Sequence, residues 1–466
     1  MTIEQIYTGC LAQGAYYIVS NGEAAIIDPL REVTPYLERA EKDNVKIKYV
    51  FETHFHADFV SGHLSLSEKT GAPIIYGPNA NPSFEAIIAE DGQVFKIGDV
   101  TITAIHTPGH TMESTTFLLK DKDGNEEAIF TGDTLFLGDV GRPDLAQKAA
   151  DMSREQLAEI LFDSLRNKIM TLPKHLTVYP GHGAGSACGK NMMKETVDTL
   201  ENQLRVNYAL RADMTKTEFV SELLNGLADP PAYFPLNVKM NKEGYEHFDQ
   251  VLQNGMNGLD PQSFEDLVNS RDALMLDVRH QSDFMKGHIP NSIFIGLSGG
   301  FAPWVGALVK DTKQEIILIG EPGQEKEAIT RLSRVGFDHV IGYLKGGFEA
   351  WKAADKAYET IDTLSSAELA AMNADHPVKI FDVRKPGEYK AAHVEGATHT
   401  PLSSINEYLE DFKQVGDLYV HCKGGYRSVI AISILKSRGI HNLINVTEGF
   451  NQIEKENFKF TKTCQN

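Results

Sequence analysis

The chain has 466 residues, 42% of them hydrophobic and 23% charged, so it is too long for one ordinary core and we expect about three domains. Its formal net charge of −19 argues against nucleic acid as a partner, because nothing would offset phosphate repulsion. The four cysteines form no CxxC pair, no secretory signal is visible, and no apolar run approaches the roughly 20 residues that span a bilayer, so we expect a cytoplasmic protein without a membrane partner.

Residues 1–235 alternate short β-rich runs with helical apolar spacing, which predicts an α/β domain. The expected strands lie at residues 16–19, 24–27, 49–51, 100–105 and 115–119, and the expected helices at 154–168 and 190–210. Clusters of histidine and aspartate follow the predicted strands. Loops at strand ends can converge while the sheet holds them still, so we expect a functional site there.

The pattern breaks near two Pro- and Gly-containing stretches, and we place a linker at residues 236–258. Beyond the linker the sequence repeats itself. Asp277-Val278-Arg279 followed by Gly287-His288 recurs, with the same spacing, as Asp382-Val383-Arg384 followed by Ala392-His393. Two copies of this length indicate duplicated small α/β domains, expected at residues 259–355 and 360–466.

Four short motifs in the first domain carry the donors of a metal site. They contain, in chain order, His54, His56 and Asp58, then His110, then Asp133, then His182. Imidazoles and carboxylates on tight Gly or Pro turns suit a divalent first-row metal, because the turns let ligands approach from several directions at little entropic cost. One HxHxD motif would be a weak signal, but four motifs in this order are a strong one.

At these motifs the chain resembles the metallo-β-lactamase fold superfamily, which implies an αββα sandwich. Members commonly hold two zinc ions, and the second requires a histidine directly after the HxHxD aspartate. That position is Phe59 here, so we expect a second metal to bind poorly. Gly141-Arg142-Pro143-Asp144 and Pro231-Ala232-Tyr233-Phe234-Pro235 make the chain more similar to the persulfide dioxygenases of this superfamily, which keep one iron.

The resemblance to persulfide dioxygenases implies that His54, His110 and Asp133 hold one Fe(II) ion. Two imidazoles and one carboxylate leave three coordination positions free, which is the usual arrangement for non-haem Fe(II) oxygen chemistry. Three further groups are expected to support these ligands or to bind metal themselves: His56, Asp58 and His182.

Substrate binding is assigned to Arg142, Cys188 and Lys190. Cys188 and Lys190 lie in a small-residue loop that opens into a predicted helix, and free backbone N–H groups there suit an anionic or thiol-bearing tail. The alternatives are a buried inert cysteine at position 188 and a structural ion pair between Arg142 and Asp144.

The second repeat copy resembles the rhodanese sulfurtransferases. Its loop begins with the nucleophile Cys422 and ends with Arg427, and the residues that form the persulfide cradle are Lys423, Gly424, Gly425, Tyr426 and Ser428. Backbone N–H groups, the arginine and the following helix N-terminus stabilise a thiolate and an anionic persulfide, which accepts and releases sulfane sulfur. In the first copy Glu321 and Lys326 occupy the places of Cys422 and Arg427, so we expect an inactive rhodanese.

The whole chain resembles fused persulfide dioxygenase–rhodanese proteins of the CstB type. The resemblance implies a low-molecular-weight thiol persulfide and O2 as substrates, sulfite and thiosulfate as linked species, and sulfide detoxification as the role; we also expect a homo-oligomer. Two alternatives stay open. One is a glyoxalase II-like dizinc thioester hydrolase fused to a rhodanese, and the other is a scaffold in which Cys422 only stores or senses sulfane sulfur.

Overall fold

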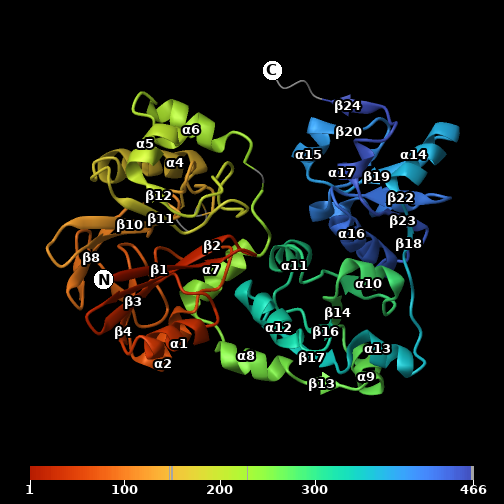
Figure 1. Ribbon diagram of the computed structural model, residues 1–466, viewed down its shortest axis with the longest axis horizontal. Coiled ribbons are helices and arrows are strands. Elements are labelled where there is room, and N and C mark those ends of the chain that lie inside the picture. Colours follow the sequence, from red (N-terminus) through yellow and green to blue (C-terminus); the bar gives the residue numbers. More distant parts are fainter. Residues whose placement is uncertain (146, 148–150, 228, 463–466) are drawn as a thin grey trace. The chain divides into compact units, whose positions relative to one another are not determined.

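The computed structural model describes residues 1–145, 147, 151–227 and 229–462 (Figure 1), so Cys464 lies outside the described residues. The chain divides into two compact units. The first consists of Met1–Gln250 and Leu332–Asp338, and the second of Val251–Arg331 and His339–Asn466. Within the described residues, no helix has the length and apolar character needed to span a membrane.

The first unit is built on two six-stranded sheets, ordered β1-β2-β3-β4-β5-β6 and β12-β11-β10-β9-β8-β7. The strands of the first sheet are β1 (Thr2–Thr8), β2 (Gln13–Ser20), β3 (Glu23–Ile27), β4 (Lys46–Phe51), β5 (Ile74–Tyr76) and β6 (Ile87–Ile88). Those of the second are β7 (Val94–Ile97), β8 (Val100–His106), β9 (Thr115–Lys120), β10 (Glu126–Gly132), β11 (Thr177–Pro180) and β12 (Asp198–Thr199). All five predicted strands are confirmed, as β2, β3, β4, β8 and β9.

An aromatic and aliphatic core lies between these two sheets. Phe51 of β4 contacts Phe95 of β7 and Phe117 of β9, with ring centroids 5.5 and 4.9 Å apart. Aromatic rings each bury on the order of 150–250 Å² and dominate such cores. The two sheets are therefore held firmly face to face, and so are the strand ends from which the loops of the site leave.

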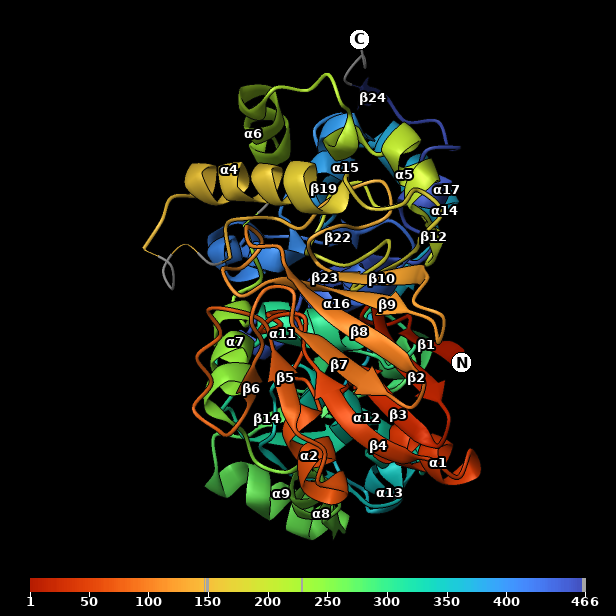
Figure 2. The ribbon, with the colours of Figure 1, turned by 90° about the vertical axis from the view of Figure 1, so that its left-hand side faces the viewer.

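Helices cover the outer face of each sheet (Figure 2). On the first sheet lie α1 (Thr34–Lys42) and α2 (His63–Thr70). On the second lie α4 (Arg154–Ser164) with its π-helical extension Leu165–Ile169, α5 (Leu200–Val206) followed by the 3-10 turn Tyr208–Leu210, and α6 (Lys216–Leu224). The layers are helix, sheet, sheet and helix, so the expected αββα sandwich is confirmed.

The helix expected over residues 190–210 is wrong in its first half, because α5 begins only at Leu200. The backbone N–H groups of Lys190 and Asn191 donate to Asp139 Oδ2 at 2.6 and 2.7 Å instead of to helical carbonyls. The segment is thus tied to a neighbouring loop, and the helix starts where the Thr199 side chain caps the N–H of Asn202.

The predicted linker, residues 236–258, is largely helical. It contains most of α7 (Phe234–Glu243) and all of α8 (Phe248–Gly255). α7 begins with a proline in its first turn, where a missing N–H costs nothing, and ends at Gly244. The first compact unit runs through this helix to Gln250.

The second unit holds two five-stranded parallel sheets with the same internal order, β13-β17-β16-β14-β15 and β18-β23-β22-β19-β21. The first copy consists of β13 (Gly258–Leu259), α9 (Pro261–Ser270), β14 (Leu274–Asp277), α10 (Gln281–Lys286), β15 (Ile293–Phe294), α11 (Phe301–Leu308), β16 (Ile316–Ile319), α12 (Glu325–Arg334), β17 (Val340–Leu344) and α13 (Gly347–Ala353). The identical strand order confirms the predicted duplication of a parallel α/β fold.

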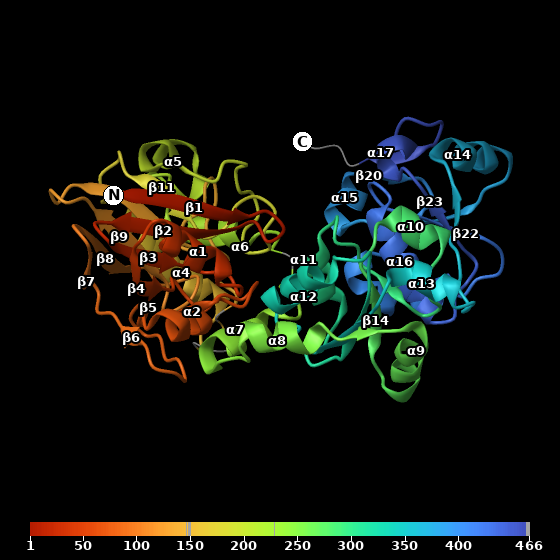
Figure 3. The ribbon, with the colours of Figure 1, turned by 60° about the horizontal axis from the view of Figure 1, so that its bottom comes forward.

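The second copy consists of β18 (Asp362–Leu364), α14 (Ser366–Asp375), β19 (Lys379–Asp382), α15 (Pro386–Ala391), β21 (Thr398–His399), the 3-10 turns Leu402–Glu407 and Leu409–Phe412, β22 (Leu418–His421), α16 (Tyr426–Ser437), β23 (Leu443–Val446) and α17 (Phe450–Ile453). A separate antiparallel pair is formed by β20 (Ala392–Val394) and β24 (Phe460–Lys462). Within this unit the two copies touch where α16 packs against β15 and α10 (Figure 3).

Candidate metal centre and sulfur-transfer loop

The predicted metal-site residues lie on loops that leave the carboxyl ends of four strands from both sheets. His54, His56 and Asp58 follow β4, while His110 follows β8, Asp133 follows β10 and His182 follows β11. All six side chains are buried. The sandwich therefore brings donors that are far apart in sequence into one region, as the strand-end argument predicts.

His54, His110 and Asp133 form the first group of donors. Asp133 Oδ2 lies 3.9 Å from His54 Nε2 and 3.5 Å from His110 Nε2, and this carboxylate oxygen is buried without a hydrogen-bond partner. An unpartnered buried carboxylate oxygen is costly unless a cation or donor compensates it. The three atoms thus fit around one metal ion.

Hydrogen bonds fix which ring nitrogen of each histidine faces this group. His110 Nδ1 lies 2.8 Å from the carbonyl oxygen of Arg142, which can only accept, so Nδ1 carries the proton. The Thr53 hydroxyl donates to Asp28 and therefore accepts from His54 Nδ1 at 2.9 Å. In both rings Nε2 keeps a free lone pair directed toward Asp133, which is the usual orientation of a metal-ligating histidine.

The protonation states also suit a cation. Burial, and then the nearby His56, hold the pKa of His54 well below its ordinary value. Burial alone would raise the pKa of Asp133, but the facing His182, His54 and His110 outweigh it and hold that pKa well below the usual carboxyl range. Neutral imidazole and ionised carboxylate are the forms that bind metal.

Two glycines allow the loops to approach this closely. A Cβ added at Gly181 would lie 2.6 Å from Asp133 Oδ1, and one at Gly141 would lie 2.8 Å from His110 Nδ1. Both distances are shorter than any side chain tolerates. The Gly turns of the motifs are therefore required by the packing of the ligands themselves.

The Nε2 atom of His56 lies in a different cluster from the first group. Its Nε2 lies 3.1 Å from Asp28 Oδ1 and 3.5 Å from Glu52 Oε2 in a buried cluster. Burial, and then the charge of Asp28, raise the pKa of Glu52 well above its ordinary value. His56 thus groups with these two carboxylates and not with His54, His110 and Asp133.

Asp58, His182 and Cys188 form a second group beside the first, with their potential ligand atoms within 4.8 Å of one another. His182 connects the two groups, because its Nδ1 lies 2.8 Å from Asp133 Oδ1 and its Nε2 lies 2.8 Å from Asp58 Oδ2. Burial, and then Asp58 and Asp133, raise the pKa of the Cys188 thiol well above its ordinary value. Sequence reasoning treated Cys188 as a substrate-binding residue and did not connect it with these two groups.

α7 holds the HxHxD loop in place through Asn241. Its Nδ2 donates to the carbonyl oxygens of His56 and Phe59, both at 2.8 Å, and its Oδ1 accepts from the N–H of Ser61 at 2.8 Å. Tyr233, just before this helix, is buried close enough to Asp58 and Cys188 for their charges to raise its pKa further, although burial is the main cause. The sequence contained no signal for Asn241; Tyr233 lies in a motif that was noticed but given no role.

Two of the predicted substrate-binding residues have structural partners. Arg142 forms a bidentate ion pair with Asp144, at 2.7 and 2.6 Å, and also reaches the carbonyl oxygen of Ala187 at 3.3 Å. The Lys190 ammonium donates to the carbonyl oxygens of Glu222 and Asn225, both at 2.8 Å, and so caps the end of α6. Lys190 is not brought together with the buried donors.

The predicted sulfur-transfer loop of the second copy lies between β22 and α16. Cys422 is buried, and its Sγ accepts the backbone N–H of Gly425 at 3.1 Å. Gly425 has φ +88°, a left-handed conformation that favours glycine and turns this N–H toward the sulfur. Lys423 and Gly424 are exposed at the loop surface, and Ser428 is buried in the first turn of α16.

Arg427 is held beside the loop by Glu388 of α15. Its two terminal nitrogens donate to the two carboxylate oxygens at 2.6 and 2.9 Å. Burial would raise the pKa of Glu388, but the hydrogen bonds and charge of Arg427 lower it to about 2. Glu388 therefore orients the arginine and offsets part of its charge; the sequence did not indicate this pairing across 39 positions.

Tyr426 of the same loop contacts the first repeat copy. Its hydroxyl donates to the carbonyl oxygen of Gly296 at 2.8 Å, and its ring lies 5.7 Å from that of Phe294. A Cβ at Gly299 would come within 2.2 Å of the Tyr426 ring. The first copy thus packs against the Cys422 loop of the second copy.

The corresponding loop of the first copy has Glu321 in place of the cysteine, and two of its N–H groups are bound by side chains of the same loop. The N–H of Glu321 donates to the Gln324 side chain at 3.0 Å, and that of Gly323 donates to the Glu325 side chain at 2.9 Å. These N–H groups are therefore already satisfied by carboxylate and amide oxygens. The two copies share a structural ion pair. Asp277 with Arg279 in the first copy and Asp382 with Arg384 in the second form the same buried pair at 2.6 Å.

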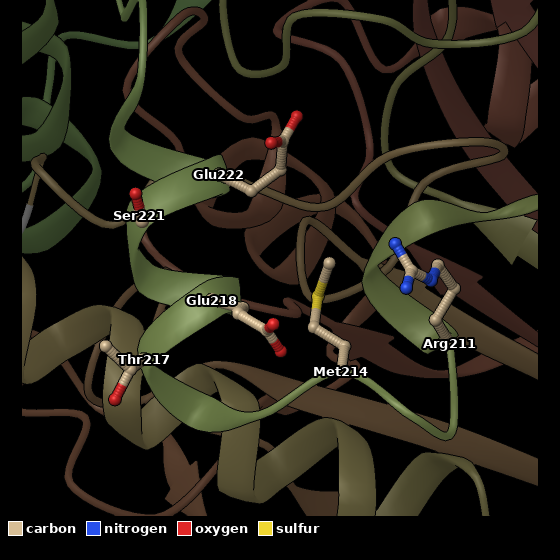
Figure 4. Close-up of a pocket in the computed structure, with 6 residues that line it drawn as sticks. All are labelled: Arg211, Met214, Thr217, Glu218, Ser221 and Glu222. Atoms are coloured by element: carbon tan, nitrogen blue, oxygen red, sulfur yellow. The ribbon is translucent and has the colours of Figure 1, made fainter.

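A hollow of about 460 Å³ lies on the surface near α6 (Figure 4). It is lined by Arg211, Met214, Thr217, Glu218, Ser221 and Glu222. Figure 4 shows carboxylates and a guanidinium around one methionine, without converging donors. None of the described metal-site or loop residues lines it, so it is not a candidate for the site.

Comparison with known proteins agrees with this architecture. Residues 8–182 match the metallo-beta-lactamase superfamily, and residues 260–354 and 365–456 match the rhodanese-like domain. The metallo-beta-lactamase from Staphylococcus aureus subsp. aureus COL is similar in structure, with a TM-score of 0.65 and 29% identity over 74% of this chain and 99% of that one.

Two curated relatives are similar to the first unit. The chain is 33% identical over 178 residues to the cytoplasmic hydroxyacylglutathione hydrolase of Arabidopsis thaliana, covering 37% of this chain and 65% of that protein, just under two thirds of its length. It is 30% identical over 200 residues to a probable hydroxyacylglutathione hydrolase of Schizosaccharomyces pombe, covering 41% of this chain and 73% of that protein. The chain therefore belongs to the metallo-beta-lactamase superfamily and continues beyond that domain into two rhodanese-like domains.

Proposed function

We propose that the first unit is an Fe(II)-dependent persulfide dioxygenase and that Cys422 performs a coupled sulfurtransferase step. The observation that carries the proposal is the donor set of His54, His110 and Asp133, with His56 turned toward Asp28 and Glu52. Two imidazoles and one carboxylate with no fourth protein ligand are typical of non-haem Fe(II) oxygenases. The resemblance of the motifs to persulfide dioxygenases supports the same assignment.

Bound iron would supply the activation of O2 and a position for the substrate sulfur. The chain supplies orientation, since the Arg142 carbonyl and the Thr53 hydroxyl hold the two imidazoles with Nε2 inward. Phe59 and Phe136 lie with ring centroids 6.2 and 6.3 Å from that of His182, and both are fully buried. These rings exclude water from one side of the site.

The proposed oxidation balances without a further cosubstrate. A thiol persulfide RSSH, O2 and one water give RSH, sulfite and two protons. The outer sulfur loses four electrons, and one O2 accepts four. The thiol is released unchanged, so the carrier acts only as the donor of sulfane sulfur.

The second step takes place at Cys422. Its thiolate attacks the outer sulfur of thiosulfate, the S–S bond breaks with its electron pair leaving on sulfite, and Cys422 keeps the sulfur as a persulfide. The Gly425 N–H and Arg427 face this negative charge. Transfer to a small thiol then yields the substrate of the first site, and the reverse sequence consumes its sulfite. Joining both sites in one chain raises their effective concentration for each other.

Thioester hydrolysis is the second candidate. It is favoured by the names of the two curated relatives and by the Asp58, His182 and Cys188 group beside the first set of donors. A metal-bound hydroxide between two ions would attack the thioester carbonyl. The rhodanese-like domains and Phe59 favour persulfide chemistry instead.

The two candidates are separated by substrate. Protein reconstituted anaerobically with Fe(II) is expected to consume O2 with glutathione persulfide, to release sulfite in equal amount, and to leave a hydroxyacylglutathione thioester intact. A zinc-loaded protein that hydrolyses the thioester, alongside an iron-loaded protein that ignores the persulfide, would overturn the proposal.

Two variants test whether the sites act separately. Asp133→Ala should lose metal and O2 uptake while thiosulfate-to-thiol transfer persists. Cys422→Ser should lose transfer while O2 uptake persists, with Cys10→Ser as the matched control for loss of a thiol. Loss of both activities in either folded variant would contradict the assignment of two independent sites.

A further inference from the structure

We propose that the turn at the end of α12, residues Leu332–Asp338, holds the HxHxD loop of the metal site in place, with Arg334 as a positioning residue. By sequence this segment, here called the α12 turn, belongs to the first repeat copy, yet its contacts place it in the first compact unit. The inference goes beyond the proposed function, because it gives the first copy a role at the metal site whichever reaction that site performs.

The α12 turn binds the HxHxD loop at Val60. The last carbonyl groups of a helix have no partner inside the helix, and that of Arg334 accepts the N–H of Val60 at 2.7 Å. Val60 is fully buried and lies between Phe59 and Ser61, whose backbone groups are bound by Asn241 of α7. The loop is therefore held from two sides, by α7 at the flanking residues and by the α12 turn at Val60 itself.

Two buried ion pairs fix the α12 turn to the loop between β3 and α1. Arg334 forms a bidentate pair with Glu32, in which Nε donates to Oε2 at 3.0 Å. Asp338 accepts from Arg31 at 2.8 Å. All four side chains are at most 15% exposed, so water screens these pairs little, and removal of one partner leaves the other charge buried and unpaired.

The β3–α1 loop in turn supports the HxHxD loop near both of its ends. Asp28 accepts the N–H and the hydroxyl of Thr53, both at 2.8 Å, and that hydroxyl accepts from His54 Nδ1. At the far end, the Ser61 hydroxyl donates to the carbonyl oxygen of Pro29 at 2.8 Å. Displacement of the α12 turn would therefore disturb both loops that orient the first metal-site histidine.

Gly336 allows the α12 turn to pack tightly against α7. It has φ +83°, and a Cβ at this position would lie 2.6 Å from Asn237 Oδ1 and 3.0 Å from Met240 Sδ. The same Cβ would lie 3.7 Å from the Val60 side chain. A side chain at position 336 would thus push the turn away from the helix and the loop that it contacts.

The second repeat copy contains the same turn at residues 435–441 without these anchors. In both copies a glycine at φ +83° follows the helix, and the N–H of the next residue donates to the carbonyl oxygen five positions earlier at 3.1 Å. The exchanged residues are Arg334 with Ser437 and Asp338 with His441. Because the turn forms with neither charged residue, their role in the first copy is attachment to the β3–α1 loop.

Hydrogen–deuterium exchange in the full-length, metal-stripped chain tests the contact without any reaction. In Arg334→Ser, which introduces the residue type of the second copy, exchange of residues 54–62 should be about 10-fold faster. Co(II) loaded into the same variant should be lost to a chelator about 10-fold faster as well. Exchange around Cys422 should stay as in the parent chain. Unchanged exchange at residues 54–62 together with unchanged Co(II) loss would overturn the proposal.

Gly336→Ala tests the same contact with both ion pairs left intact, and Gly439→Ala is its matched control. Both glycines have φ +83°, so the two variants carry the same backbone strain, but a Cβ at position 439 meets no atom within 4 Å. Gly336→Ala should speed exchange of residues 54–62 and loss of Co(II) several-fold, whereas Gly439→Ala should change neither. Equal behaviour of the two variants would refute the inference even if Arg334→Ser fails to fold.

A charge exchange tests whether Arg334 acts through Glu32. Arg334→Glu should release the loop at least as much as Arg334→Ser does, and addition of Glu32→Arg should restore slow exchange of residues 54–62. A folded double variant without recovery would remove Arg334 from its positioning role. Persulfide oxidation enters none of these measurements, so failure of the proposed function leaves their outcome unchanged.

Discussion

Removal of the Asn241 side chain tests how the metal-site loop is held. Asn241 is 1% exposed and bridges α7 to the HxHxD loop by three hydrogen bonds of 2.8 Å, to the backbone of His56, Phe59 and Ser61. In Asn241→Ala those three backbone groups lose their partners inside the protein. Each unsatisfied buried group costs about 1–3 kcal/mol, so three of them predict a loss of about 3–9 kcal/mol in the unfolding free energy of the first unit.

The two compact units can be observed separately, because both tryptophans, Trp304 and Trp351, belong to the second unit. Tryptophan fluorescence thus follows the rhodanese-like part, while far-ultraviolet circular dichroism follows both parts. In urea, Asn241→Ala should move the dichroism transition to lower concentration and leave the fluorescence transition in place. Fe(II) affinity should fall as well, since the same loop carries His54.

Asn237→Ala is the matched control. Asn237 lies one turn earlier on α7, is equally buried, and neither polar atom of its side chain makes a hydrogen bond. Its truncation removes an unsatisfied amide, so we expect little or no destabilisation. Equal losses in the two variants would show that α7 acts through packing alone, and the hydrogen-bond argument would then be wrong.

Three further changes have defined outcomes. Gly181→Ala places a Cβ 2.6 Å from Asp133 Oδ1 and should weaken metal binding about 10- to 100-fold in a metal titration, whereas Gly9→Ala, which meets no atom within 4 Å, should leave it unchanged. Glu388→Gln removes the charge that offsets Arg427 and should speed alkylation of Cys422 by iodoacetamide several-fold, while the exposed Glu395→Gln should not. Burial lowers the pKa of His288 from 6.5 to about 4. The folded state therefore binds this proton less readily than the unfolded state, so the stability that the neutral ring contributes is complete above pH 6.5. This stability is lost as the pH falls toward 4, by about 3 kcal/mol at 1.36 kcal/mol per pKa unit. The tryptophan-monitored midpoint should follow this trend and flatten in His288→Gln; an unchanged slope would disprove the assignment.

Much of the fold follows from local patterns. Alternating apolar runs marked β2, β3, β4, β8 and β9, and the repeated Asp-x-Arg motif marked the duplicated domains through a buried ion pair that both copies retain. The motif histidines and aspartates could be grouped because each follows a strand whose end the sandwich fixes. In these cases the information lies within a few residues of the feature it predicts.

Other features depend on contacts between distant segments. Asn241 supports a loop 180 residues earlier, and nothing in its surroundings distinguishes it from Asn237. The start of α5 was misplaced because Asp139 draws the preceding segment out of the helical pattern. In the sequence, Phe59 was interpreted as the loss of one metal ligand. The structure places the thiol of Cys188, from another loop, near Asp58 and His182. The residues around position 59 gave no indication that Cys188 lies close to Asp58 and His182.

The contact between Tyr426 and the first repeat copy gives that copy, which has Glu321 at the cysteine position, a structural role in this chain. Cys422 belongs to the second copy, and the missing side chain of Gly299 in the first copy leaves the space that the Tyr426 ring occupies. Deletion of the first copy would remove the residues that contact the Tyr426 ring and the carbonyl that accepts the hydrogen bond of its hydroxyl. Substitutions at Gly296 or Gly299 in the first copy are therefore constrained by the Cys422 loop of the second copy.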